Sequence, residues 1–267
     1  MVLEKEFLEG PHAIMIPHTS DGRVLFAVPW HNHVVLGTTD TPIDETLEEP
    51  KPIEEEIDFI LANAGQYMTK KPKRKDVKSV FAGLRPLAAN QESDSETKEI
   101  SRHHKINVST SGLISILGGK WTTYRKMAED AINTASVVAG LKEVKCSTHK
   151  LKLLGFKENI DFNHPLHAYG SDADEISNIG TEKDNDSLSD KFYISRNLII
   201  WSIKKEMAIH LDDVLARRTR CLFLDAQETK KIAPTVAKIM AEILNKNESW
   251  IKNELSFTNK IIKNYII

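Results

Sequence analysis

Residues 116–132 read ILGGKWTTYRKMAEDAI, and this stretch decides the fold of the middle of the chain. An apolar run ends at Gly118 and Gly119, and Lys120 and two threonines then precede a pattern with helical spacing. Gly140 ends the predicted helix. One face of this helix is apolar and contains Tyr124, Met127, Ala128, Ala131, Ile132, Ala135 and Val138. The sequence therefore predicts a strand, a tight turn and an amphipathic helix.

The turn before this helix carries the first candidate site. A helix N-terminus exposes backbone N–H groups and the positive end of the helix dipole, and Lys120 adds a full charge beside them. This combination suits a phosphate, or a group that becomes anionic during a reaction. It is not a Walker A loop, because a strand-like segment separates Gly112 from Gly118 and Trp121 stands where Ser or Thr would bind magnesium. A plain strand-to-helix turn with a solvated lysine explains the same residues equally well.

Composition narrows the class of protein. The chain has 267 residues, 40% of them hydrophobic and 28% charged, and a net charge of −2, so no overall field attracts nucleic acid. No apolar run approaches the roughly 20 residues of a membrane span, and the first residues lack the basic region of a signal peptide. Cys146 and Cys221 form no CxxC motif. We expect a soluble cytoplasmic protein with reduced thiols and no nucleic-acid partner.

The rest of the chain divides by pattern. Residues 12–39 predict antiparallel strands, residues 52–68 a helix that starts at Pro52, and HKINVS and GLISIL two further strands. After about residue 150, short polar loops alternate with helices, and residues 178–190 are expected to form a loop or a mobile connector. We expect three regions: 1–109, rich in strands; 110–149, the strand–turn–helix unit; and 150–267, all helical.

Other charged residues give weaker signals. Arg85 precedes Pro86, which favours an extended backbone, and its planar fork suits a carboxylate or phosphate, although such an arginine is more often a surface ion-pair partner. LDDVLARRTR, residues 211–220, is interpreted as a charged outer helix face with an Asp213–Arg217 pair. Four histidines lie in two close pairs, but nothing completes a metal site, and none is expected; they are His31, His33, His103 and His104.

One absence in the sequence is informative. The chain has twelve glycines, and no two of them are separated by a single residue. GxGxxG therefore occurs nowhere in it, and the usual dinucleotide-binding βαβ start is excluded from these residues.

Five segments, in this order, resemble the C-terminal part of FAD-dependent glycerol-3-phosphate dehydrogenase and of the related glycerol-3-phosphate oxidase. They are MIPHTSDGRVLFAVPWHNHVVLGTTDTP, FAGLRPL, SILGGKWTTYRKMAEDAI, HAYGSDA and MAIHLDDVLARRTRCLFLDA. The resemblance implies a mixed α/β and α+β fold, a partial DAO-like flavoprotein. Residues 1–109 would belong to the substrate domain, 110–149 would complete the FAD domain, and 150–267 would form the helical C-terminal domain. The chain is expected to be a fragment without the GxGxxG half.

The family also implies roles for particular residues. Arg85 would reach the substrate phosphate or lie next to the flavin, and Lys120 would lie close to the substrate; both are the expected catalytic residues. The flavin-facing turn would consist of Gly118, Gly119, Lys120, Thr122 and Thr123. The implied reaction moves a hydride from C2 of glycerol 3-phosphate to N5 of FAD and yields dihydroxyacetone phosphate.

The resemblance also implies partners and leaves alternatives. The partners would be glycerol 3-phosphate, the absent FAD-binding half and, in the full enzyme, a peripheral contact with the cytoplasmic membrane face or a quinone. The isolated chain is expected to bind FAD weakly or not at all and to be inactive. The motifs leave quinone and oxygen open as electron acceptors. Two alternative functions are another flavin amine or amino-acid oxidase, with Arg85 holding a carboxylate, and a non-catalytic helical interaction module.

Overall fold

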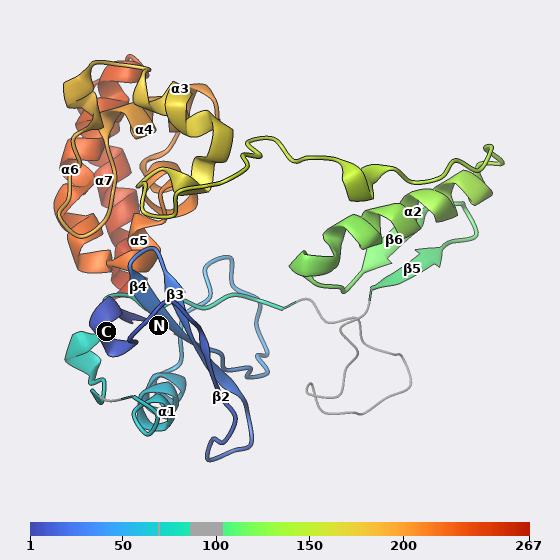
Figure 1. Ribbon diagram of the computed structural model, residues 1–267, viewed down its shortest axis with the longest axis horizontal. Helices are drawn as coiled ribbons and strands as arrows, with labels where there is room; N and C mark the ends of the chain where they lie inside the picture. Colours follow the sequence, from blue (N-terminus) through green and yellow to red (C-terminus); the bar gives the residue numbers. More distant parts are fainter. Residues whose placement is uncertain (69, 86–103) are drawn as a thin grey trace. The chain divides into compact units, whose positions relative to one another are not determined.

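The computed structural model describes residues 1–68, 70–85 and 104–267, which form two compact units (Figure 1). The first unit contains residues 1–41, 45–83 and 157–267. The second contains residues 42–44 and 84–156.

The first unit begins with an antiparallel sheet in the order β1-β4-β3-β2 (Figure 1). Its strands are β1 (Val2–Glu4), β2 (Ile14–Ile16), β3 (Leu25–Trp30) and β4 (His33–Gly37). The predicted hairpin is confirmed: His31 and Asn32 connect β3 to β4 with φ of 46° and 61°, the left-handed backbone that a two-residue hairpin turn requires. Helix α1 (Glu54–Ala64) begins after Ile53, so Pro52 lies just outside the helix rather than inside its first turn.

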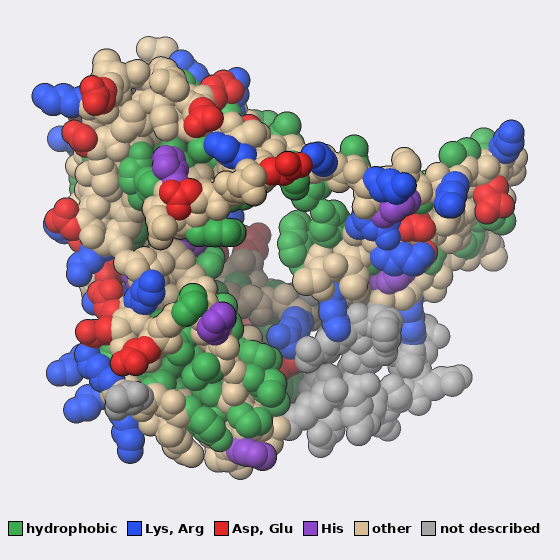
Figure 2. Space-filling view, in the orientation of Figure 1, with side chains coloured by type: hydrophobic (Ala, Val, Ile, Leu, Met, Phe, Trp, Pro, Cys, Tyr) green, Lys and Arg blue, Asp and Glu red, His purple; other side chains and the backbone are tan. Residues whose placement is uncertain are grey.

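The two faces of this sheet differ in burial. Leu25 and Ala27 on β3 and Ile16 on β2 are buried in one core with α1, to which Ile57 and Ile60 contribute. The alternate residues Phe26 and Met15, which pair across β3 and β2, are exposed on the other face. Figure 2 shows apolar side chains gathered over these strands. The period-2 pattern of a half-buried strand is present, but its outward positions are apolar.

The helical part of the first unit follows residue 157. It contains α3 (Ala173–Ser177), α4 (Arg196–Lys204), α5 (Cys221–Leu224), α6 (Ala226–Ile243) and α7 (Glu248–Ile262). Polar side chains cap the three longest of these: Ser195 accepts from Leu198 N, Asp225 from Glu228 N and Asn247 from Trp250 N. Their apolar faces form one core, in which Phe192 is buried; its fully buried residues include Ile199, Leu211, Leu215, Val236 and Met240. Trp201 is buried in a separate cluster with Leu198 and Ile176.

Short 3-10 helices connect the elements of both units. They cover Lys5–Phe7, Arg74–Asp76, Trp121–Thr123, Thr148–Lys150, His167–Asp172, Glu182–Asn185 and Lys263–Tyr265. The Glu182–Asn185 turn lies in the predicted loop 178–190. Asn185 Nδ2 donates to Ser177 O over 2.8 Å, and Asn197 Nδ2 donates to Asn185 Oδ1 over 2.9 Å. This loop is therefore fastened to α3 and α4, in agreement with the first of the two predicted alternatives, a loop.

The interpretation of LDDVLARRTR as a charged outer helix face is also wrong in part. The predicted Asp213–Arg217 pair is present at 3.1 Å, but residues Asp213–Arg218 form a π-helical turn. Asp212 is buried and pairs with Arg217 over 2.6 Å, and Asp213 accepts the N–H groups of Ile209 and His210. Asp213 thus satisfies N–H groups at the start of this turn, and Arg217 compensates the buried charge of Asp212.

Residues 78–81 join the sheet part to the helical part within the first unit. Val2 and Ser79 pair as a β-bridge, and Ser79 Oγ donates to Leu222 O over 2.8 Å. Val80 N donates to Tyr265 O, and Ala226 N donates to Lys78 O. The two parts of this unit thus share backbone hydrogen bonds as well as apolar contacts.

A buried carboxylate near the start of the π-helical turn leads to a pH-dependent prediction. Glu254 accepts from Leu211 N over 2.7 Å and contacts His210 Nδ1 at 2.9 Å. The hydrogen bond to Glu254 raises the pKa of His210 above its ordinary 6.5. The resulting stability is fully present below pH 6.5 and is lost as the pH rises through the raised pKa of the folded state. His210→Gln should therefore destabilise the chain more at pH 5.5 than at pH 8.5.

Urea unfolding of the wild type and the variant at both pH values measures this difference. His149→Gln, at an exposed histidine of the second unit, is the control and should show no such pH dependence. An equal destabilisation by His210→Gln at both pH values would contradict the prediction.

The second unit is the strand–turn–helix region predicted from the sequence. Strands β5 (Lys105–Val108) and β6 (Ile114–Leu117) form an antiparallel hairpin, and α2 (Tyr124–Val138) follows. No residue of α2 is buried within the described parts of the chain, and Ile132 on the predicted apolar face is 65% exposed. A two-stranded hairpin with one helix has too little surface to form a core of its own. The predicted apolar face exists, and the described residues cover it only in part: Met127, Ala131 and Ala135 are half-buried, and Tyr124, Ile132 and Val138 are exposed.

Candidate functional site

The Gly-Gly turn connects β6 to the start of α2. Gly118 and Gly119 both have left-handed backbone, with φ of 71° and 86°. A Cβ on Gly119 would lie 2.6 Å from Met127 Cε, so the turn lies directly against α2. The left-handed backbone thus favours glycine at both positions.

Lys120 begins the first helical turn. Its N–H donates to Thr123 Oγ1 over 3.3 Å, and its carbonyl accepts from Thr123 N over 3.0 Å. Thr123 therefore closes the turn, while the side chains of Lys120 and Thr122 are exposed. The first N–H groups of such a turn have no carbonyl one turn earlier, which leaves donors for an anion beside the lysine. Trp121 is 85% exposed, and its ring stacks on Tyr124 with centroids 5.4 Å apart.

Charges further along α2 are paired with one another. Lys126 forms an ion pair with Asp130 over 2.7 Å, and Arg125 with Glu129 over 2.7 Å. The hydrogen bond from Lys126 is the main interaction that lowers the pKa of Asp130, and His104 adds to it. Lys120 makes no ion pair with any residue that the structure describes. It is thus available to a ligand.

The other expected residue, Arg85, lies at the end of a described segment. It is exposed and belongs to the same compact unit as the Gly-Gly turn. Pro86 and Leu87, which complete the GLRPL motif, lie outside the described residues, as does His103. The structure therefore places Gly118, Gly119, Lys120, Thr122 and Thr123 in one turn, and the substrate role of Arg85 stays a prediction.

The remaining candidate histidines have structural contacts. His33 is buried, and its Nδ1 lies 2.9 Å from His31 O in the hairpin; His104 Nε2 lies 3.1 Å from Asp130 Oδ2. No group of three potential metal ligands occurs among the residues that the structure describes.

A cavity of about 410 Å³ in the first unit was not predicted from the sequence. His31, His167, Arg218 and Arg220 line it together with residues from the loop 187–193. The two arginines belong to the segment interpreted as an outer helix face, and His167 belongs to the HAYGSDA motif. The signal that could have indicated the cavity was the group of three arginines in LDDVLARRTR.

Comparison with known proteins defines first the class and then the family. Residues 2–125, which contain the four-stranded sheet and the Gly-Gly turn, match the family model for FAD dependent oxidoreductases. Residues 110–250, more than half of the chain, match the C-terminal domain of alpha-glycerophosphate oxidase. The chain belongs to the family of FAD-dependent glycerol-3-phosphate dehydrogenases. The predicted fold class, a DAO-like region followed by a helical domain, is confirmed.

Individual relatives agree with this assignment. The chain is 36% identical over 273 residues to a mitochondrial glycerol-3-phosphate dehydrogenase of Bos taurus, and 31% identical over 288 residues to a probable one of Dictyostelium discoideum. These alignments cover 93% and 98% of the chain. The X-ray structure of glycerol-3-phosphate dehydrogenase from Bacillus halodurans, complexed with FAD, superposes with a TM-score of 0.79 at 26% identity and covers 100% of the chain.

The match does not extend over the whole of these relatives. The chain spans 37% of the bovine protein, 45% of the Dictyostelium protein and 56% of the Bacillus halodurans chain. Among the described residues, no helix combines the length and the apolar character needed to cross a membrane.

Proposed function

We propose that this chain supplies the substrate-side and flavin-facing portion of an FAD-dependent glycerol-3-phosphate oxidoreductase. The reaction would convert sn-glycerol 3-phosphate to dihydroxyacetone phosphate. The observation that carries the proposal is the left-handed Gly118-Gly119 turn, which sets Lys120 at the first turn of α2 in a chain of this family.

This turn fits the pyrimidine edge of a flavin ring. Glycines without side chains let a flat ring approach the backbone, and the helix start and Lys120 both favour negative charge. When bound, FAD would accept the hydride that leaves C2 of glycerol 3-phosphate. Lys120 and the first N–H groups of the helix would stabilise the negative charge that develops beside them, without reorganising during the step.

Arg85 is proposed to anchor the substrate phosphate. Its guanidinium offers parallel N–H donors that match two phosphate oxygens, and such a clamp holds the reacting carbon in one orientation. Arg85 would then act on binding and alignment, whereas Lys120 would act on the developing charge.

GxGxxG, the motif that binds the pyrophosphate of FAD in dinucleotide-binding domains, is absent from the 267 residues of the chain. We therefore propose a partner segment that carries this fingerprint. Two partly uncovered apolar surfaces support it: α2, in which no described residue is buried, and the Phe26 face of the sheet.

Co-expression with an FAD-binding segment from a family member tests the proposal. The complex should retain stoichiometric FAD and reduce a dye with glycerol 3-phosphate, and the chain alone should retain none. Ile132→Asp should abolish association because it charges the exposed apolar face of α2, whereas Asn133→Asp adds the same charge at an exposed polar neighbour and should leave association intact. A folded complex with FAD but no activity, or tightly bound FAD in the chain alone, would contradict it.

A further inference from the structure

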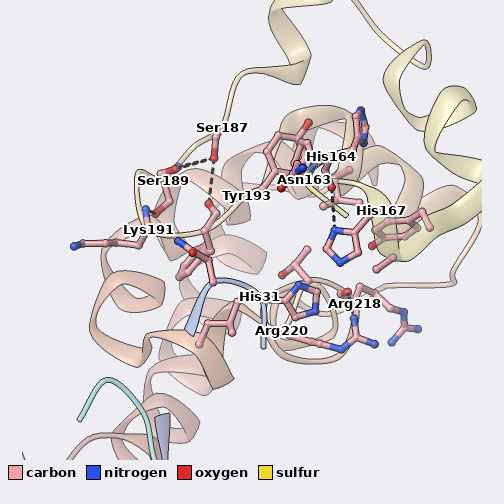
Figure 3. A pocket seen from close by; sticks show the side chains of 18 of the residues that line it. His31, Asn163, His164, His167, Ser187, Ser189, Lys191, Tyr193, Arg218 and Arg220 are labelled. Carbon is pink, nitrogen blue, oxygen red and sulfur yellow. Dashed lines mark hydrogen bonds between the residues drawn. The ribbon is translucent and has the colours of Figure 1, made fainter. Parts of the chain in front are cut away.

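A cavity of about 410 Å³ lies between the β3–β4 hairpin tip and the helical part of the first unit (Figure 3). His31 reaches it from the hairpin, His167 from a 3-10 helix, and Arg218 and Arg220 from the end of the π-helical turn. We propose that this cavity binds the phosphate group of a small phosphate monoester. This site is separate from the Gly-Gly turn and does not depend on the proposed oxidoreductase function.

The charges that line the cavity favour a dianion. Arg218, Arg220 and Lys191 are positive, and Asp190 is the carboxylate in the lining. Lys191 also lies 3.7 Å from Glu4 Oε1 and points away from the two histidines (Figure 3), so the positive charge available to a ligand comes mainly from the two arginines. In a recess with partly apolar walls this charge acts more strongly than on an open surface. Guanidinium groups pair with phosphate oxygens through parallel N–H donors.

The cationic side chains are held in place before any ligand binds. Arg218 Nε donates to Glu206 O over 3.0 Å, and Arg220 Nη1 donates to Arg218 O over 3.3 Å. His167 Nδ1 lies 2.9 Å from His164 O, which fixes the ring and leaves Nε2 for another partner. The rings of His31 and His167 lie 5.8 Å apart and turn toward the same space (Figure 3). Little side-chain entropy remains to be lost on binding, which favours affinity.

The size and walls of the cavity favour an ester over a bare ion. A volume of about 410 Å³ is in the range of small-molecule pockets. Phe162 lies against His167 with ring centroids 5.9 Å apart, and Tyr193 forms another wall, its hydroxyl donating to Asn185 O over 3.1 Å. These rings offer contact area for the organic part of a ligand.

Protonation of His31 should be coupled to binding. Burial lowers the pKa of His31 below 6.5, and the nearby charges of Arg220, His167 and His33 lower it further. Arg218, Lys191, His164 and the carboxylate of Asp190 also line this space. A dianion would offset the surrounding positive charge and raise the pKa of His31, so a ligand that stays a dianion should bind more tightly as the pH falls from 7.5 to 5.5.

NMR of the full chain with labelled histidines provides a local test, because His31 and His167 report on the cavity itself. Phenyl phosphate should shift both imidazole signals and should bind at least about 5-fold more tightly than inorganic phosphate, because its ring can contact the aromatic wall. Sulfate stays a dianion throughout, so its affinity should increase at least about 3-fold from pH 7.5 to 5.5 through the protein alone.

Variants separate this site from nonspecific attraction. Arg220→Gln should weaken phenyl phosphate binding by about 10-fold or more, since a charge-assisted contact is lost, whereas Lys230→Gln, at an exposed lysine of α6, should change it less than about 2-fold. His167→Gln should weaken it as well and decides the question if Arg220→Gln does not fold. No shift at His31 and His167, equal affinity for the two phosphate probes, or equal effects of Arg220→Gln and Lys230→Gln would overturn the proposal. Lys120→Met should leave the imidazole signals of His31 and His167, and their response to phenyl phosphate, unchanged. A failed oxidoreductase assay with intact phenyl phosphate binding would therefore count against the proposed function and not against this site.

Discussion

Lys120→Met should slow reduction of bound flavin by glycerol 3-phosphate by about 10²–10³-fold in the complex with the FAD-binding segment. Methionine keeps the length and apolar stem of the side chain and removes the charge. Lys120 is exposed and makes no ion pair with the residues that the structure describes, so the change should not disturb the fold. The loss corresponds to one missing donor to a developing negative charge, about 3–4 kcal/mol of transition-state stabilisation.

Stopped-flow measurement of flavin absorbance gives this rate directly. Lys142→Met removes the same charge from an exposed lysine beyond the end of α2, and its rate should stay within about 2-fold of the wild type. A role of Lys120 in the reaction should lower kcat more than it raises KM, because the stabilised charge develops during the step. An unchanged rate in Lys120→Met would remove this lysine from the mechanism.

The sequence predicted the Gly-Gly turn because its signals are local. Two consecutive glycines between a strand and a helical pattern indicate left-handed backbone, and Gly118 and Gly119 have it. The same pattern predicted the apolar face of α2. It could not predict that the face is only partly covered in the described chain, because periodicity identifies a face that needs a partner and does not identify the partner.

The cavity, in contrast, could not be predicted from the sequence. Its histidines and arginines come from residues 31, 167, 218 and 220, which are distant in sequence, and each alone has the ordinary appearance of a surface residue. Asp212 was misjudged for a related reason. An acid near an arginine is typical of an exposed helix, and only the packing of the π-helical turn places Asp212 inside. Tertiary contacts, not local spacing, decide both features.

Leu215→Ala should destabilise the first unit by about 3–4 kcal/mol, because truncating a leucine in a closed core removes apolar contacts and leaves a cavity. Leu215 is 0% exposed and belongs to the core cluster that includes Leu211, Val236 and Met240. Leu47→Ala, at a leucine of the same unit that is 50% exposed, is the matched control and should cost less than about 1 kcal/mol. Urea unfolding followed through the buried Trp201 reports on this unit. Equal losses in the two variants would contradict the buried position of Leu215.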